Sequence, residues 1–236
     1  MDNLQDLRCL VSELESASDE QKQIQILQQI SKLLLTQYEI HISDEEIIEP
    51  LRVEAYYYPY RTPNKFEDPC AHPSSKKIGT FGRLYFIESQ YGYPGVDLCL
   101  SQGDYYLSFL IKNSHIGDVF YKQMDLFDRL QDRWQEIEQV VALRKRAALL
   151  TGIPVFKTSR VGLRLERTKF AHKLLASVIE IQRYKYDWEK GYGKIWTVAN
   201  YLVEHDLEAD DDTIYKLLGS NSEEVKDIYK KIQGVK

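Results

Sequence analysis

The sequence has few cysteines and no long hydrophobic run. Cys9, Cys70 and Cys99 are the only cysteines, and no two of them form a C-x-x-C pair. An odd, scattered set is typical of reduced thiols, so we expect a cytoplasmic protein. No apolar run approaches the roughly 18 residues needed to span a bilayer. The acidic, amphipathic start at Met1–Leu4 also differs from a signal peptide, so we expect no membrane partner.

Several motifs that carry chemistry are absent as well. The sequence contains no GxxxxGK[ST], no GxSxG and no HExxH. Its five histidines do not have the spacing of metal ligands, and the cysteines do not complete such a set. We therefore expect neither a metal ion nor a cofactor.

What the chain does contain is a large supply of tyrosine. Its 236 residues are 43% hydrophobic and 28% charged, which is ordinary for a globular protein that buries a core, and 17 of them are tyrosines. A tyrosine ring offers a flat apolar face and a polar edge. This composition suits the stacking of a base or sugar, and it equally suits a half-wet core.

The formal net charge of −5 is unevenly distributed. Between Val141 and Ile195 there are 13 Lys and Arg against 4 Asp and Glu. A basic stretch on an acidic chain favours contact with nucleic acid, although the same pattern is also typical of a solvated surface.

Hydrophobic periodicity predicts helices at the N-terminus and strands after it. Residues 4–38 have apolar side chains at helical spacing and predict two helices, with a cap at Ser18–Glu20. A loop over 37–42 and a short acidic helix over 44–49, capped by Ser43, are expected next. Strands are expected at 51–58, 80–87, 96–100 and 105–113.

The remaining chain reads as mainly helical, over 123–150, 194–205 and 225–232, with a solvated acidic run at 206–212; residues 167–186 read as helix or strand, and helix is preferred. The expected fold is α+β: a single domain whose curved antiparallel or mixed sheet is wrapped by helices. Residues 1–50 are expected as a helical extension and 51–236 as the domain itself.

The strand at 51–58 carries the first candidate site residues. Glu54 and Tyr56 share one face, with Cα atoms roughly 7 Å apart. They head an ordered series of short motifs: Glu54-Ala55-Tyr56, Glu67-Asp68 leading to Ala71-His72, Gly82-x-Leu84-Tyr85, Gly95–Ser101 and Leu110-Ile111-Lys112. This order resembles the alkyladenine (3-methyladenine) DNA glycosylase family over about a quarter of the chain, Val53–Asn113.

The resemblance implies a monofunctional DNA glycosylase, a hydrolase that removes a modified base in base excision without metal or cofactor. The base would be flipped out of DNA, and Glu54 would activate water against the anomeric carbon. Residues implied to bind the substrate are Tyr56, His72, Tyr85, Asp97, Ser101 and Lys112. Residues implied to contact the nucleic-acid backbone are Tyr93, Arg144, Lys145, Arg146, Arg160, Gly162 and Arg164.

The sequence departs from the family pattern at several of these positions. Pro94 stands where the family has an intercalating aromatic residue, Ser101 replaces an Asn, and Lys112 replaces an Arg. Asp97 adds a carboxylate that the family does not show there. A changed substrate and a lost activity are both compatible with these differences.

Other interpretations remain open from sequence. Glu54 would serve only the fold if it paired with Arg52 or Arg61, and Tyr56 would then be a packing residue. The protein would then be a non-catalytic nucleic-acid binder of the same fold, or a purely structural protein. A hydrolase of modified nucleosides, using the same carboxylate and tyrosines, is a further alternative.

Overall fold

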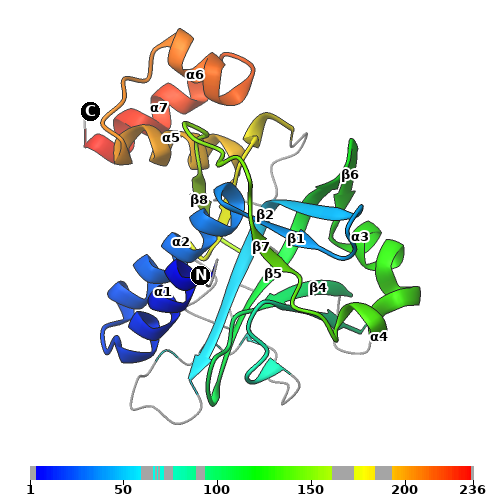
Figure 1. The fold of residues 1–236 in the computed structure, drawn as a ribbon. Helices are drawn as coiled ribbons and strands as arrows, with labels where there is room; N and C mark the ends of the chain where they lie inside the picture. Colours follow the sequence, from blue (N-terminus) through cyan, green and yellow to red (C-terminus); the bar gives the residue numbers. More distant parts are fainter. Residues whose placement is uncertain are drawn as a thin grey trace.

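The structure, a computed structural model, describes residues 4–59, 66, 68, 70–71, 77–88, 94–160, 173–183 and 193–234. It is an α+β single domain built on a curled antiparallel half-barrel sheet with an N-terminal helical region (Figure 1). The strands are β1 (Tyr38–His41), β2 (Ile47–Pro59), β3 (Arg83–Ile87), β4 (Gly95–Cys99), β5 (Tyr105–Ile116), β6 (Val119–Lys122), β7 (Leu143–Lys145), β8 (Phe156–Thr158) and β9 (Ala176–Val178). The helices are α1 (Gln5–Ser16), α2 (Glu20–Thr36), α3 (Gln123–Leu130), α4 (Trp134–Ile137), α5 (Lys194–Glu204), α6 (Asp211–Leu218) and α7 (Glu223–Gln233), with short 3-10 turns η3 (Gln131–Arg133) and η6 (Ile181–Arg183).

The sheet is centred on two long strands, β2 and β5. Its order is β3-β4-β5-β2-β1-β7; β6 extends β5, β9 pairs with β2, and β8 pairs with β9. Every pairing is antiparallel, and β2 aligns with β5 from Ile48–Ile116 to Pro59–Tyr105. Because opposite residues in an antiparallel pair share a face, this register fixes which side chains meet across the sheet.

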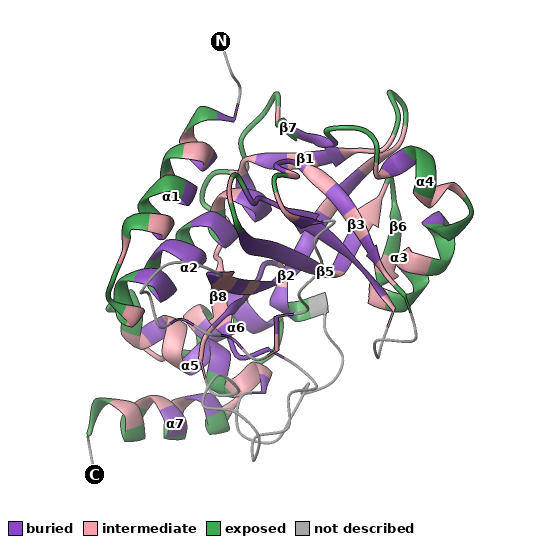
Figure 2. Cartoon of the chain, turned by 90° about the horizontal axis from the view of Figure 1, so that it is seen from below, coloured by how far each residue is buried: buried purple, intermediate pink, exposed green. Residues whose placement is uncertain are grey.

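One face of the sheet is apolar and packs on the N-terminal helices. Val53, Ala55 and Tyr57 alternate along β2, and Phe109 lies opposite Ala55 on β5. They belong to a buried cluster that includes Leu34 of α2 and residues of α1. Figure 2 shows the central strands β2 and β5 buried beside these helices. The alternation of 53–58 that predicts a strand is therefore also what anchors α2.

A second apolar core lies at the C-terminal end of the chain. Helices α5, α6 and α7 enclose it, and Phe156 of β8 and Val178 of β9 contribute to it from the sheet. The three helices sit together at one end of the molecule (Figure 1). Asp210 caps α6 and Ser222 caps α7, which satisfies first-turn N–H groups that a helix leaves unpaired.

Several expectations on secondary structure are confirmed. The two N-terminal helices are α1 and α2, with Asp19 as the cap of the second. The strands expected at 51–58, 80–87, 96–100 and 105–113 correspond to β2, β3, β4 and β5, and the helices expected at 194–205 and 225–232 correspond to α5 and α7. The curved antiparallel sheet is also confirmed.

The loop at 37–42 and the helix at 44–49 are wrong: this segment is a β1–β2 hairpin. Ser43 makes the bonds that suggested a cap, since its Oγ accepts from the N–H groups of Glu45 and Glu46, but no helix follows. The expected boundary between residues 50 and 51 falls inside β2, so residues of the expected extension contribute strands to the central sheet.

The single helix expected at 123–150 is also wrong. It divides into α3, η3 and α4, and β7 then joins the sheet because Leu143 pairs with Ile40. The described part of the helix expected at 167–186 contains β9 and η6 instead. Within the acidic run at 206–212, Asp211 and Asp212 form the first turn of α6. No helix among the described residues is long or apolar enough to cross a membrane.

Candidate active site

The second face of the sheet is polar, and much of it is buried. Along β2 it carries Arg52, Glu54 and Tyr56; across the sheet, Glu54 lies opposite Leu110, which lies opposite Asp97. The exposed fraction is 0% for Glu54 and 2% for Asp97. Burying carboxylates is costly unless they are paired, so the partners of these groups decide what the face can do.

Glu54 is held between its two neighbours on the same side of β2. Arg52 Nη2 donates to Glu54 Oε1 at 3.2 Å, and the Tyr56 hydroxyl donates to Oε2 at 3.1 Å. Neither charged side chain is more than 4% exposed. The carboxylate is thereby fixed in orientation, and it is closed to solvent in this arrangement.

Two compensating irregularities in the β2–β5 pairing surround Arg52. The register shifts between Pro50 and Arg52 and again between Arg52 and Val53, so that Arg52 pairs with Asn113 while Val53 pairs with Ile111. Bulges re-aim side chains and are frequent beside functional sites. Here they accompany the two adjacent buried charges of Arg52 and Glu54.

Tyr56 is sandwiched between the acid and a second buried ion pair. The guanidinium of Arg160 lies 4.5 Å from the centre of the Tyr56 ring. Arg160 also binds both carboxylate oxygens of Asp68 and the carbonyl oxygen of Ala55. Burial, and next the negative charge of Glu54, raise the pKa of Tyr56 well above its usual value. Tyr56 therefore remains a neutral phenol that donates to Glu54.

Asp97 forms the third buried ion pair of the face. Its Oδ2 accepts from Lys77 Nζ at 2.6 Å and from Ser108 Oγ at 3.0 Å. Burial is the largest single influence and lowers the pKa of Lys77, but the charge and hydrogen bond of Asp97, together with the nearby Cys99 and Tyr85, outweigh it, so that the net shift of the pKa is upward. Lys77 also lies 4.8 Å from the centre of the Tyr85 ring, which connects the pair to the edge strand β3.

Tyr85 lines a pocket beside β3, at the edge of the sheet. The pocket has a volume of about 490 Å³ and is lined by Arg83, Tyr85, Trp134 and Glu138, among others. A pocket of about 250 Å³ adjoins it and shares Tyr85, Trp134 and Glu138, and one of about 350 Å³ lies between α2, β8 and α5. Glu54 lines none of these three, so the residue proposed from sequence as catalytic stands apart from them.

Ser101 and Lys112 have partners inside the protein. The Ser101 hydroxyl accepts from the backbone N–H of Leu107 at 3.0 Å, which closes the turn between β4 and β5. Lys112 Nζ donates to Gln123 Oε1 at 2.6 Å. The first contact fixes the backbone and the second joins two side chains, and neither by itself forms a base-binding group.

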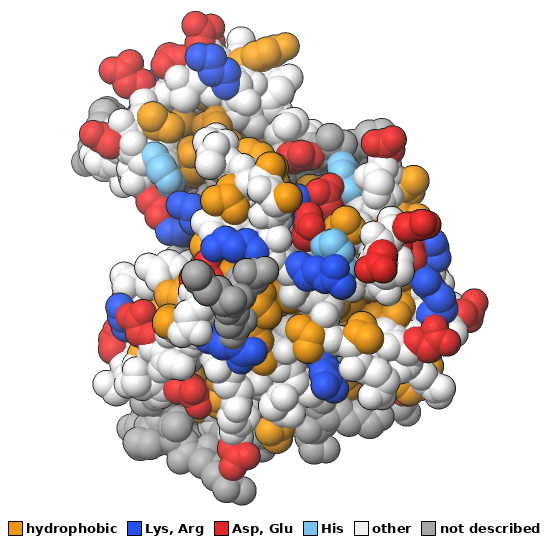
Figure 3. Space-filling model, viewed as in Figure 1, with side chains coloured by type: hydrophobic (Ala, Val, Ile, Leu, Met, Phe, Trp, Pro, Cys, Tyr) orange, Lys and Arg blue, Asp and Glu red, His pale blue; other side chains and the backbone are white. Residues whose placement is uncertain are grey.

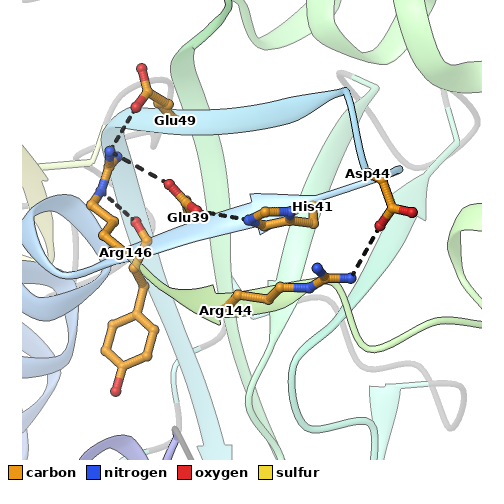
Figure 4. A network of polar contacts seen from close by, with 7 residues as sticks. Glu39, His41, Asp44, Glu49, Arg144 and Arg146 are labelled. Carbon is orange, nitrogen blue, oxygen red and sulfur yellow. Dashed lines mark hydrogen bonds and ion pairs between the residues drawn. The ribbon is translucent and has the colours of Figure 1, made fainter. Parts of the chain in front are cut away.

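Three of the basic residues expected on nucleic-acid backbone lie on another part of the sheet from Glu54. Arg144, Lys145 and Arg146 are on β7 or directly follow it, beside β1, and β1 pairs with the first residues of β2. Arg146 donates to Glu49 Oε1 at 2.6 Å and to the carbonyl oxygen of Tyr38 at 3.0 Å (Figure 4). Through Ile40, Leu143 aligns with Ile48, six residues before Glu54; the three cations that follow Leu143 lie two strands away from β2 and roughly 10–17 Å from Glu54 along the strand direction.

Acidic groups accompany most of these cations. Lys145 bonds to Asp6, and Arg144 lies 4.0 Å from the exposed Asp44. On the face shown in Figure 3, Lys and Arg side chains are interspersed with Asp and Glu and form no continuous stripe. Arg160 is wholly buried in its pair with Asp68. His72, Tyr93, Gly162 and Arg164 lie outside the described residues.

No protein-family model matches the chain, and no curated protein matches it. The function must therefore be argued from the site alone. Among the described residues, no group of three or more His, Cys, Asp and Glu is arranged to hold a metal ion.

Sequence reasoning missed three residues that shape the site. Lys77, Asp68 and Ser108 received no role, although each contacts a charged group of the polar face. Strand periodicity could have indicated Ser108, because it lies two residues from Leu110 and therefore on the same face of the strand. No sequence pattern indicated Lys77 or Asp68, since each lies outside the strands and its partner is distant in the sequence.

Proposed function

We propose that the protein is a monofunctional DNA glycosylase that hydrolyses the N-glycosidic bond of a modified base. The observation that carries the proposal is the buried Glu54 carboxylate, oriented by Arg52 and Tyr56 on the polar face of the sheet. The pairing with Arg52 is also the contact that a purely structural Glu54 would make, so the proposal assigns Arg52 and Tyr56 the role of orienting the acid. The order of motifs around Glu54 supports the choice of substrate class.

The proposed reaction uses Glu54 twice. Its carboxylate accepts a proton from a water molecule whose oxygen attacks the anomeric carbon of the sugar. The bond to the base nitrogen breaks, and its electron pair leaves with the base. The same negative charge stabilises the positive charge that develops on the sugar. The products are the free base and an abasic sugar.

Base entry requires the site to open. Glu54 has no exposed surface, and the flipped base must lie against an aromatic face. Tyr56 bonds to Glu54, and because Arg160 covers one face of its ring, the base would lie against the other face. The proposal therefore includes a conformational step before chemistry, as is frequent for enzymes that exclude water from the reacting groups. A cytoplasmic location without metal or cofactor is part of the same proposal.

A second candidate is a hydrolase of modified nucleosides with the same catalytic acid. It is favoured by one observation, the engagement of Lys145 and Arg146 by Asp6 and Glu49. Cations that already form ion pairs within the protein attract a phosphate backbone less strongly. On this candidate, replacing Lys145 with Ala leaves turnover unchanged.

Base release decides between these candidates. The purified chain is incubated with genomic DNA that carries varied modifications and, in parallel, with a panel of modified nucleosides, and released bases are identified by mass spectrometry. We expect release from DNA that falls by about 10²- to 10⁴-fold in Glu54→Gln. Glu45→Gln, an exposed acid near the start of β2, is the matched control and should retain full release.

Three other outcomes count against the main proposal. If Glu54→Gln releases base from DNA as fast as the wild type, Glu54 does not activate the water. Release from nucleosides but not from DNA favours the second candidate. Salt-dependent DNA binding with no released base leaves a non-catalytic binder.

A further inference from the structure

Asp97 has one carboxylate oxygen that no residue of the described ranges binds. Its Oδ2 receives hydrogen bonds from Lys77 and Ser108, at 2.6 and 3.0 Å. Its Oδ1 is buried and accepts no hydrogen bond from any residue that the structure describes. The side chain as a whole is only 2% exposed, so bulk water does not take the place of a partner.

An unsatisfied buried acceptor is costly, and more so when it is charged. An ion pair with a purely structural purpose would gain nothing from this arrangement. Lys77 and Ser108 both bind the same oxygen, although the other lies on the same carboxylate. The geometry therefore keeps one oxygen available for a donor that is not part of the described chain.

The available oxygen lies within a larger polar surface. Tyr56 is close enough to Glu54, Arg160 and Asp97 to respond to the charge of each. Arg160, which stacks on Tyr56, has an Nε–H that is also buried and has no partner within the described ranges. An acceptor and a donor thus remain unused near one aromatic ring.

The spacing of Glu54 and Asp97 matches the size of a nucleoside. They occupy the same face of β2 and β4, with Leu110 of β5 between them. Two strand spacings separate their Cα atoms by roughly 10 Å. Leu110 shares this face, so a nucleoside that reaches both carboxylates, with its sugar carbon near Glu54 and the far edge of its base toward Asp97, must pack over the Leu110 side chain once the site has opened.

We propose that Asp97 determines the specificity of the site by accepting a hydrogen bond from an N–H group on the edge of the base. This inference rests on the proposed function, with Glu54 as the acid that acts at the sugar. It names the substrate class: bases that carry an exocyclic amine or a protonated ring nitrogen. Bases whose N–H groups are all methylated are rejected, because the Oδ1 acceptor is then left unpaired.

The test is a binding experiment that does not depend on bond cleavage. The probes are deoxyadenosine, deoxycytidine and thymidine, each paired with a counterpart methylated so that no N–H remains on the base. Titration calorimetry on the full chain is expected to show that at least one member binds about 10- to 100-fold tighter than its counterpart.

Asp97→Asn is expected to abolish this preference. Lys77 and Ser108 donate to the Oδ2 position, so the amide oxygen is held there and the NH₂ group replaces the acceptor. Ser108→Ala is the matched control, because it removes a contact to Oδ2 only and should keep the preference. If Asp97→Asn does not fold, the double variant Lys77→Gln/Asp97→Asn removes both charges together.

Two results would overturn the inference: no probe binding more tightly than its methylated counterpart, or a preference that survives removal of the Asp97 carboxylate. The test also separates this inference from the proposed function. A preference that disappears in Asp97→Asn but persists in Glu54→Gln supports the role of Asp97, even where no base is released from DNA.

Discussion

Arg160 and Asp68 form a two-contact ion pair in which neither side chain is exposed. Arg160 Nη2 donates to Asp68 Oδ1 at 3.1 Å, while Nη1 binds Oδ2 and also donates to the carbonyl oxygen of Ala55 at 3.1 Å. Arg160 directly follows β8, and through this pair it is held against the centre of β2, next to Tyr56. A residue that sequence assigned to nucleic acid is thus a structural support of the polar face.

Breaking this pair on one side should destabilise the protein strongly. Asp68→Ala leaves an uncompensated buried guanidinium, so we expect the free energy of unfolding to fall by about 3–5 kcal/mol. Urea denaturation followed by circular dichroism measures the change. The double variant Asp68→Ala/Arg160→Met removes both charges and should recover much of the loss; equal losses in the single and double variants would contradict the prediction.

The β7 cations should differ in their effect on stability. Arg146 has a side chain only 7% exposed and bonds to Glu49 and Tyr38, so Arg146→Ala is expected to cost about 1.5–3 kcal/mol. Arg144 is 55% exposed and its partner Asp44 is almost fully exposed. Arg144→Ala should therefore change stability by less than about 0.5 kcal/mol in the same denaturation experiment. Similar losses for the two would refute the distinction.

Stability should decline at alkaline pH through the thiol of Cys99. Burial, and next the charge of Asp97, raise the pKa of Cys99 from 9.0 to about 12. Above pH 9 the unfolded thiol loses its proton while the folded one keeps it, so unfolding becomes more favourable as pH rises. This group then removes at most about 1.4 kcal/mol per pH unit.

The matched variant for this prediction is Cys99→Ala. Urea denaturation across a series of pH values starting below 9 should show a shallower alkaline decline in the variant than in the wild type. Buried tyrosines contribute to both curves, so the difference between the slopes isolates the thiol. Parallel slopes would show that Cys99 does not carry the effect.

Gly82 and Gly152 allow backbone strain to be separated from crowding. Both have positive φ, 79° and 72°. A Cβ at Gly82 would lie 3.0 Å from Val141 Cγ1, whereas a Cβ at Gly152 would meet nothing within 4 Å. We expect Gly152→Ala to cost about 1–2 kcal/mol from strain alone, and Gly82→Ala to cost measurably more by thermal unfolding. If the two variants lose equal stability, the Val141 side chain moves away from the new Cβ at no cost in free energy.

The central sheet was predictable where side chains alternate, and its edges were not. Residues 53–58 predict β2 because apolar and polar side chains alternate along them. Tyr38–His41 and Leu143–Lys145 are too short to show a period; the first becomes a strand by pairing with β2 and β7, and the second by pairing with β1. Val141 continues the helical spacing of the preceding residues, but it bridges to Arg83 at the edge of β3. Tertiary pairing overrides the local pattern there.

The site was predictable in its strand members and not in its loop members. Glu54 and Tyr56 share a face by simple periodicity, and Arg52 was available as a partner by the same rule. The partner of Asp97 lies 20 residues away and that of Arg160 lies 92 residues away. No local pattern encodes these contacts, because the curl of the sheet brings them together.

The register of β9 has a consequence for the whole terminal third of the chain. Ala176 lies opposite Glu54, while Val178, two residues further along β9, is buried among α5, α6 and α7. The hydrogen bonds between β9 and β2 involve the residues on either side of Glu54, such as the N–H of Ala55, which donates to the carbonyl oxygen of Leu175. A three-residue strand thus connects a helical bundle to the segment of β2 that carries the acid. Amide exchange at Val53 and Ala55 therefore measures how firmly the bundle is attached.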